Sequence, residues 1–229
     1  MIRPGAIGDV ILSLPALESA KADYTEVWAS RVTLPLIRFA DKTRAIADTG
    51  LDLVGVTRAR CAALEAFDEI YSWYGTNRPE FREAVAHLPF TFFPAQSLPA
   101  TAPRIEMPPV ERRNFAIIHP YSSSAKKNWP LENFQAVAEQ IENVEWCIPG
   151  KIEDLYELAC WISTARVYIG NDSGISHLAA AAGTPVIAIF ISTDPRIWAP
   201  RGDHVAVLEN PTVAEVLDRC LEHRVLKHG

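Results

Sequence analysis

The stretch from Val167 to Ala182 constrains the fold of this chain more than any other. Residues 166–169 form a short β-branched and aromatic run, which is typical of a buried strand. Turn-forming and capping residues follow. Residues 178–182 are then strong helix formers, and Gly183 is expected to end the helix. The order predicts a strand, a tight turn and a helix whose free N–H groups can bind phosphate. The alternative is that these residues form only a turn and a cap.

Strand and helix patterns alternate along the rest of the chain, which predicts an α/β fold with parallel sheets. We expect strands at residues 26–29, 51–56, 69–73, 90–93, 115–118, 144–148, 185–190 and 204–208. We expect helices at residues 10–17, 34–47, 62–67, 81–87, 130–141 and 155–162, and a capped helix from Thr212. Pro15 predicts that the first helix starts late or bends. The proline-rich segment Pro94–Pro109 predicts a linker between two domains, residues 1–105 and 106–229.

The composition fits an ordinary globular protein, with 48% hydrophobic and 22% charged residues. The net charge is −6 and neither half is basic, which argues against nucleic acid as the main ligand. No apolar run is long enough to span a bilayer, and the first residues lack the pattern of a signal peptide. The four cysteines lie far apart without a Cys-x-x-Cys motif, which indicates neither a zinc site nor a disulfide framework and favours the cytoplasm.

Four polar loops follow predicted strands, at residues 5–9, 119–129, 170–177 and 192–202. In parallel sheets, ligands bind at the carboxyl ends of the strands. We therefore expect these loops to carry the functional residues.

The motifs in these four loops resemble, in the same order, those of the heptosyltransferases, glycosyltransferase family 9. They are Gly8-Asp9-Val10 with residues 14–17, His119-Pro120 with Ser122, Ser123 and Lys127-x-Trp129-Pro130, residues 170–174 with His177, and Thr193-Asp194-Pro195 with Trp198 and Pro200. The resemblance implies a GT-B fold, in which two Rossmann-like domains face each other across a cleft. It implies an acceptor site on the first domain and a nucleotide-sugar site on the second. It also implies an inverting reaction without a metal or cofactor, and the sequence has no Asp-x-Asp pair.

The resemblance assigns two catalytic residues. Asp9 matches the base that takes the proton of the acceptor hydroxyl. The alternative for Asp9 is an N-cap of the following helix, and the two roles are compatible. Lys127 matches the lysine that binds the leaving diphosphate, and its alternative is a solvated loop residue, with Lys126 as a rival.

The remaining site residues are also carried over from the resemblance. The donor-binding residues are Ser122, Ser123, Lys127, Glu153, Asp172, Ser173, Gly174, Ile175 and His177. The acceptor-binding residues are Gly8, Trp73 and Asn77. Asp172 has three alternatives, which are to orient a sugar hydroxyl, to orient Lys127, or to cap the helix. His177 can be structural instead, the serines can be plain turn residues, and Trp73 can be a core residue.

The chain departs from the family pattern in two places. The first strand is nearly absent before Pro4, and the segment from Gly150 to Asp172 has room for one helix where the family has a helix, a strand and a second helix. The second segment supplies nucleoside contacts in the family, so the assignment of Glu153 to the ribose depends on this alignment.

The sequence therefore predicts a metal-independent inverting glycosyltransferase that moves a sugar, with heptose favoured, from a nucleoside-diphosphate donor such as ADP-heptose. The acceptor is expected to be a cell-envelope saccharide such as lipopolysaccharide core, with peripheral contact at the inner face of the cytoplasmic membrane allowed. One alternative is a truncated homologue that binds a nucleotide sugar without transferring it. Another is a nucleotide-sugar epimerase on a similar fold. A dinucleotide oxidoreductase is disfavoured, because Gly5-x-x-Gly8 lacks the required glycine spacing.

Overall fold

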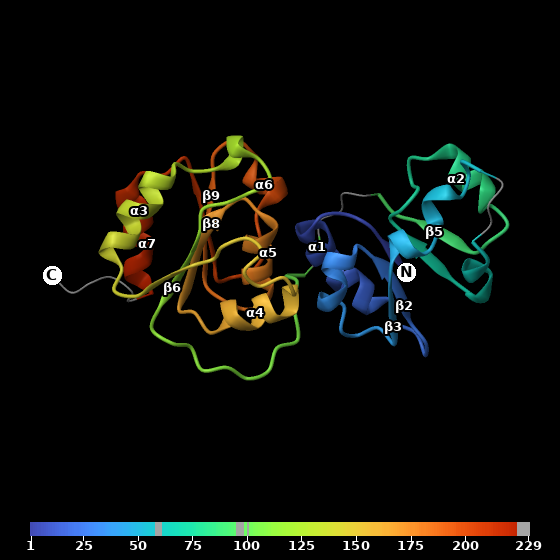
Figure 1. Cartoon of the computed structure of the whole chain (residues 1–229), viewed down its shortest axis with the longest axis horizontal. Helices are drawn as coiled ribbons and strands as arrows, with labels where there is room; N and C mark the ends of the chain where they lie inside the picture. Colours follow the sequence, from blue (N-terminus) through green and yellow to red (C-terminus); the bar gives the residue numbers. More distant parts are fainter. Residues whose placement is uncertain (58–60, 95–98, 100, 224–229) are drawn as a thin grey trace. The chain divides into compact units, whose positions relative to one another are not determined.

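The computed structural model describes residues 1–57, 61–94, 99 and 101–223 (Figure 1). The chain divides into two compact units, Met1–Pro99 and Ala100–Gly229. Each unit is built on a five-stranded sheet in which every paired strand is parallel. The predicted α/β class with two parallel sheets is confirmed. None of the helices in the described ranges has the length and apolar character that a membrane span requires.

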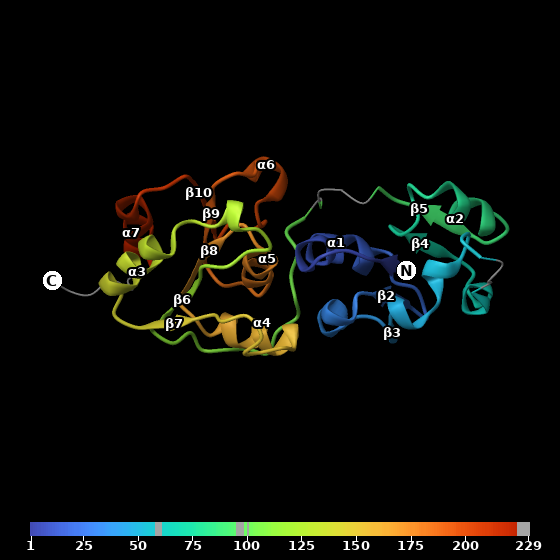
Figure 2. The ribbon, with the colours of Figure 1, turned by 45° about the horizontal axis from the view of Figure 1, so that its top comes forward.

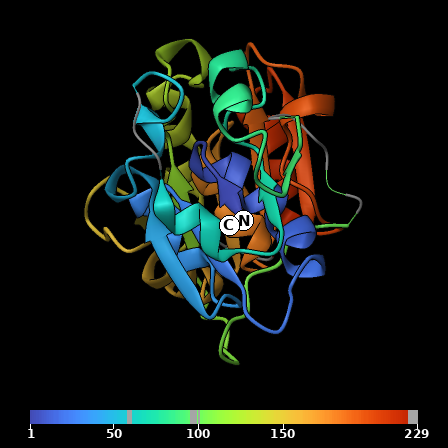
Figure 3. The same ribbon diagram turned by 90° about the vertical axis from the view of Figure 1, so that its right-hand side faces the viewer.

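The N-terminal unit has the strand order β3-β2-β1-β4-β5. Its strands are β1 (Ile2–Arg3), β2 (Glu26–Ala29), β3 (Lys42–Ala45), β4 (Ile70–Ser72) and β5 (Phe90–Phe92), and its α-helices are α1 (Ile7–Ser19) and α2 (Pro79–Ala84). Two clusters of buried side chains flank the sheet. One contains Val10 of α1 with Val27, and the other contains Phe81 of α2 with Ile2 and Trp28. The view in Figure 3 shows these blue to blue-green elements from another direction.

The C-terminal unit has the strand order β10-β9-β8-β6-β7. Its strands are β6 (Ala116–His119), β7 (Val144–Trp146), β8 (Val167–Asn171), β9 (Val186–Phe190) and β10 (Val205–Glu209). Its α-helices are α3 (Leu131–Gln140), α4 (Leu155–Ser163), α5 (Gly174–Ala181), α6 (Pro195–Trp198) and α7 (Val213–Glu222). Helices α3 and α7 lie side by side on one face of the sheet, and α4 and α5 lie on the other (Figures 1 and 2).

The strand order of each sheet reverses direction at one point. In the N-terminal unit the chain builds outward from β1 to β3 and then returns to place β4 on the other side of β1. In the C-terminal unit the chain goes from β6 to β7 and then returns to place β8 on the other side of β6, so the switch point lies between β6 and β8. Ligands of open parallel sheets bind beyond the carboxyl ends of the strands at such a switch point. The loops after β1, β4, β6 and β8 are therefore the places where each unit can hold a ligand.

Most of the expected strands are present, with ends that shift by one or two residues. The prediction of a helix at residues 34–47 is wrong. A 3₁₀ helix ends at Leu36 and the edge strand β3 follows. Pro35 lacks the N–H that a continuing helix needs, and β3 carries polar side chains because an edge strand is partly solvated.

Two further expectations are also wrong. The strand expected at residues 51–56 is not formed: Leu51–Leu53 form a short 3₁₀ helix, and Leu51 and Val54, three residues apart, both enter the core. Helix α1 starts at Ile7, so the expected late start is wrong, and the helix includes Pro15.

The expected linker Pro94–Pro109 lies partly outside the described residues, which omit 95–98 and 100. Farther along, Ile105 is buried and its N–H donates to the carbonyl of Ala181 in α5. The carbonyl of Glu106 accepts a hydrogen bond from the hydroxyl of Tyr156 in α4. These two residues are therefore bonded to the helices of the C-terminal unit.

Phe134 of α3 supports the face of the sheet that α3 and α7 cover. Its side chain is fully buried, and its ring meets that of Trp129 edge-on at 5.0 Å between centroids. We expect Phe134→Ala to lower the free energy of unfolding by about 3–5 kcal/mol, because the ring leaves a cavity. Urea unfolding followed by circular dichroism measures the change. Leu131→Ala in the same helix is the control, since this side chain is 47% exposed, and an equal loss in both variants would contradict the assignment.

Candidate functional site

The N-terminus of α5 lies at the carboxyl end of β8. Ser173 is the N-cap residue, and its hydroxyl accepts the backbone N–H of Ser176 at 3.3 Å. Asp172, the other expected cap residue, does not cap the helix. The first N–H groups of a helix have no partner inside the helix, and they carry its positive dipole end. Gly174 and Ile175, which are half-buried, therefore start α5 with donors available to an anion.

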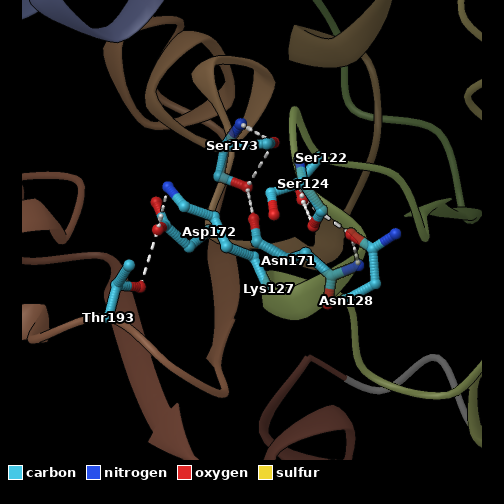
Figure 4. Close-up of polar contacts among 9 residues, drawn as sticks. Ser122, Ser124, Lys127, Asn128, Asn171, Asp172, Ser173 and Thr193 are labelled. Carbon is cyan, nitrogen blue, oxygen red and sulfur yellow. Dashed lines mark hydrogen bonds and ion pairs between the residues drawn. The ribbon is translucent and has the colours of Figure 1, made fainter.

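Lys127 and Asp172 form an ion pair beside this helix start. The Lys127 ammonium is 2.8 Å from the carboxylate of Asp172, and the Thr193 hydroxyl donates to the same oxygen at 2.7 Å (Figure 4). Asp172 follows β8 and Thr193 follows β9, so the ends of two neighbouring strands hold the carboxylate. Of the three alternatives for Asp172, the contact with Lys127 is the one that this structure contains.

The side chain of Asn171 fastens the loop that carries Lys127 to the end of β8. Its carbonyl oxygen accepts the backbone N–H of Trp129 at 2.9 Å. Its amide donates to the carbonyl of Pro120 at 2.8 Å and reaches the side chain of Asn128 at 3.5 Å. Asn171 is fully buried, and it bonds residues at both ends of the loop between β6 and α3. This one side chain therefore sets the position from which Lys127 extends.

Ser122 belongs to the same network. Its hydroxyl hydrogen-bonds with the side chain of Asn128 at 2.6 Å and with the carbonyl of Ser124 at 2.8 Å (Figure 4). These bonds are the turn chemistry that the sequence offered as the alternative for this serine. Ser123 is exposed, and Lys126 is exposed next to the half-buried Lys127.

A buried group of side chains lies beneath these loops. The His119 ring donates from Nδ1 to the carbonyl of Cys147 at 3.0 Å, because a carbonyl can only accept. Burial lowers the pKa of His119, raises the pKa of Cys147 to about 11 and raises the pKa of Tyr168. The three groups are therefore neutral near pH 7. His177 is also buried, in the first turn of α5.

In the N-terminal unit, Arg3 connects the loop after β1 to α1. Its guanidinium donates to the hydroxyl of Ser13 at 2.6 Å, to the carbonyl of Pro4 at 2.7 Å and to the carbonyl of Asp9 at 2.9 Å. Burial lowers the pKa of Arg3, and the charge of Asp9 opposes that shift. The carboxylate of Asp9 accepts the N–H of Ala6 at 2.9 Å. Asp9 therefore caps α1 from inside its first turn.

The end of β4 lies on the other side of β1. Trp73 is 6% exposed, its ring stacks on Phe93 at 4.8 Å, and the Arg3 guanidinium lies 5.8 Å from its centroid. Its indole N–H is buried and has no hydrogen-bond partner in the part of the chain that is described. Asn77 is exposed and Gly8 lies in the first turn of α1. Arg3 thus brings Asp9 and Trp73 together.

The structure brings together Lys127, Asp172 and Ser173, which sequence motifs identify. Glu153 is exposed on the loop after β7, at the same edge of the sheet, just before the Asp154 cap of α4. Sequence reasoning missed the roles of Arg3, Asn171 and Thr193. A charged residue directly before the Pro4-Gly5 loop was a usable signal for Arg3. The partners of the other two lie 21 to 51 residues away, and no local pattern shows them.

Residues 148–223, which include α4, α5 and the loop after β9, match the family model of glycosyltransferase family 9 (heptosyltransferase). The predicted resemblance to family 9 is confirmed. Lipopolysaccharide heptosyltransferase 3 of Escherichia coli is 27% identical over an alignment of 117 residues, with a coverage of 38% of this chain and 34% of that protein. The core heptosyltransferase OpsX of Haemophilus influenzae is 30% identical over 116 residues, 39% of this chain and 33% of that protein. The chain thus spans about a third of the length of these relatives.

The heptosyltransferases of family 9 also share the fold. The E. coli heptosyltransferase WaaC, solved with ADP, has a TM-score of 0.66 and 15% identity, over 97% of this chain and 98% of that chain. The E. coli ADP-heptose heptosyltransferase II has a TM-score of 0.72 and 15% identity, over 97% of both chains. These similarities confirm the GT-B fold class.

A third similar structure bears on metals. The iron-containing dodecameric glycosyltransferase TibC of E. coli has a TM-score of 0.52 and 16% identity, over 92% of this chain and 62% of that chain. In the described ranges of the present chain, no three His, Cys, Asp or Glu side chains are grouped to hold a metal ion.

The buried hydrogen bonds of Asn171 should contribute to the free energy of unfolding. We expect Asn171→Ala to lower the free energy of unfolding by about 2–4 kcal/mol, because the Trp129 N–H and the Pro120 carbonyl lose their buried partner. Denaturant unfolding measures the change. Asn143→Ala, which removes an exposed amide that bonds to the carbonyl of Asn114, is the control and should change stability by less than about 0.5 kcal/mol. Equal small effects would show that Asn171 does not hold the loop.

Burial of His119 should make the stability of the fold depend on pH. Because burial lowers the pKa of His119 from its ordinary value of 6.5, the unfolded chain binds a proton that the folded chain does not. Its contribution to stability is thus complete above the ordinary value and is lost as the pH falls toward the lowered one. We expect the loss of stability between about pH 7.5 and 5.5 to be smaller in His119→Phe than in the wild type. Urea unfolding at the two pH values tests this, and an unchanged loss would contradict it.

Proposed function

We propose that this chain is an inverting glycosyltransferase that uses a nucleoside-diphosphate sugar as donor. The proposal rests on two features at the switch point of the C-terminal sheet. They are the Lys127 ammonium and the N-terminus of α5. The match of residues 148–223 to family 9 supports the same reaction class. The alternative is a binding protein without transferase activity.

The donor site is proposed to hold a diphosphate. The backbone N–H groups that start α5 would bind phosphate oxygens, and the Lys127 ammonium would supply a positive charge. Ser123, which is exposed on the same loop, would add a hydroxyl donor, and Ser122 would shape the turn. His177 would support the first turn of α5 from below, and Glu153 would bind the ribose hydroxyls. These groups would stabilise the leaving diphosphate without a metal.

Asp9 is proposed to be the general base. Its carboxylate would take the proton of the acceptor hydroxyl while that oxygen attacks the anomeric carbon of the donor sugar. The bond from the anomeric carbon to the diphosphate would break in the same displacement, and its electron pair would leave with the nucleoside diphosphate. One displacement from the opposite side inverts the anomeric centre. The acceptor would lie beside Gly8, Trp73 and Asn77 at the switch point of the N-terminal sheet.

The finer assignment is that the donor is ADP-heptose, the acceptor is a lipopolysaccharide-type saccharide and the reaction takes place in the cytoplasm. WaaC is solved with ADP, and the E. coli and Haemophilus relatives are lipopolysaccharide heptosyltransferases, which supports this choice. Thermal shift with ADP, GDP and UDP tests the base, and the largest rise is expected with ADP. A larger rise with another nucleotide would replace adenine in the assignment.

Lys127 and Lys126 give a matched pair of binding variants. We expect Lys127→Met to weaken ADP binding roughly 10-fold or more, because the diphosphate loses its cation. Lys126→Met removes the same charge from the exposed neighbour and should bind ADP as the wild type does. Isothermal titration calorimetry measures both dissociation constants. Equal weakening would show that only the total charge of the loop matters.

A variant of Asp9 distinguishes the proposed transferase from a binding protein without transferase activity. We expect Asp9→Asn to keep the affinity for ADP and to lower the transfer rate roughly 10²–10⁴-fold, because the base is gone. The assay is transfer from ADP-heptose to lipopolysaccharide that lacks heptose, followed by mass spectrometry. Asparagine still offers an oxygen to the N–H of Ala6, so α1 stays capped. A wild-type chain that binds ADP and transfers nothing would favour the binding protein, and isomerised ADP-sugar released without acceptor would indicate an epimerase.

A further inference from the structure

We propose that Asp172 is an internal anion that competes with the donor diphosphate for Lys127, and that Thr193 weakens this competition. The inference rests on the proposed diphosphate site and adds how that site binds and releases its ligand. It assigns a positioning role to Thr193, which lies on the loop after β9.

The carboxylate of Asp172 is held in place before any ligand arrives. Its side chain is 6% exposed, and one oxygen receives both the Lys127 ammonium at 2.8 Å and the Thr193 hydroxyl at 2.7 Å. The backbone N–H of Asp172 donates to the carbonyl of Ile189 in β9 at 2.9 Å. The backbone and the side chain are therefore both fixed, and the carboxylate cannot move far when an anion binds.

Lys127 is the more exposed partner of this pair. Its side chain is 26% exposed, and it ends in an ammonium with three donors on a flexible four-carbon stem. Asp172 lies two residues before Gly174, so an anion bound at the start of α5 is close to its negative charge. A diphosphate carries more charge than a carboxylate and also gains the backbone donors of α5. Lys127 can therefore turn from Asp172 toward the diphosphate.

Thr193 decides how strongly the carboxylate holds the lysine. While Lys127 turns to the diphosphate, the Thr193 hydroxyl still donates to the carboxylate and lowers the penalty of leaving it buried with a single partner. When the nucleoside diphosphate has formed as product, Asp172 recovers Lys127 and repels the product. The pair thus limits the affinity for both donor and product and speeds release.

This arrangement predicts opposite changes in two variants. Asp172→Asn removes the competing charge at nearly the same shape, so inorganic pyrophosphate and ADP should bind about tenfold more tightly. Thr193→Val leaves the carboxylate dependent on Lys127, so both ligands should bind roughly three- to tenfold more weakly. Thr193→Ser keeps the hydroxyl and should restore wild-type affinity. A purely structural role would weaken binding in both Asp172→Asn and Thr193→Val.

The experiment is isothermal titration calorimetry of the full chain with pyrophosphate and with ADP, together with stopped-flow measurement of ADP release. Asp194→Asn is the control, because it removes one negative charge from the same loop, where the carboxylate bonds only to Arg196 among the described residues. We expect the control to bind as the wild type does and Asp172→Asn to release ADP more slowly. If Asp172→Asn does not fold, the Thr193 variants decide the matter.

Unchanged or weaker binding in Asp172→Asn, or unchanged or tighter binding in Thr193→Val, would overturn the inference while leaving the diphosphate site intact. Equal tightening in Asp194→Asn would also overturn it, because general charge would then explain the effect. A wild-type chain that binds neither pyrophosphate nor any nucleoside diphosphate would overturn the proposed donor site, and this inference with it.

Discussion

The carboxamide of Asn171 is the interaction on which the C-terminal site depends. It meets an N–H donor at Trp129 and a carbonyl acceptor at Pro120, so it must offer an acceptor and a donor at once. The amide places its acceptor and its donor on two separate atoms, whereas a carboxylate lacks the donor and an aliphatic group lacks both. Because the side chain is fully buried, water cannot replace these bonds. The loop that carries Lys127 is therefore fixed from the last residue of β8.

The strand order places the switch point of the C-terminal sheet between β6 and β8. The segment from Gly150 to Asp172 contains the single helix α4, and the chain returns directly from β7 to β8. In the described chain the sheet therefore ends at β7, next to β6. Glu153 follows β7 at this edge of the sheet, whereas Lys127 and Asp172 meet beyond β6 and β8.

The sequence predicts the elements whose local pattern agrees with their place in the fold. The buried strands are β-branched runs, and Thr212 and Glu215 form the expected capping box of α7, with hydrogen bonds of 2.7 and 3.3 Å. The failures occur where tertiary context overrides the pattern. The polar edge strand β3 has no alternation of apolar and polar residues. Leu51 and Val54 place their apolar side chains three residues apart, which is a helical spacing. The site behaves similarly, since motifs identify Lys127 and Asp172 but not the distant residues that hold them.

The two aspartates of the switch points differ in what surrounds their carboxylates. Asp172 is committed to a cation and a hydroxyl. In the N-terminal unit Arg3 binds the backbone carbonyl of Asp9 instead of its carboxylate, and in the described chain that carboxylate has a single hydrogen bond, from the N–H of Ala6. The two carboxylates therefore differ in their partners, since that of Asp172 meets an ammonium and a hydroxyl and that of Asp9 accepts a backbone N–H. The same residue type thus binds a cation through its side chain in the C-terminal unit and accepts a backbone N–H at the start of a helix in the N-terminal unit.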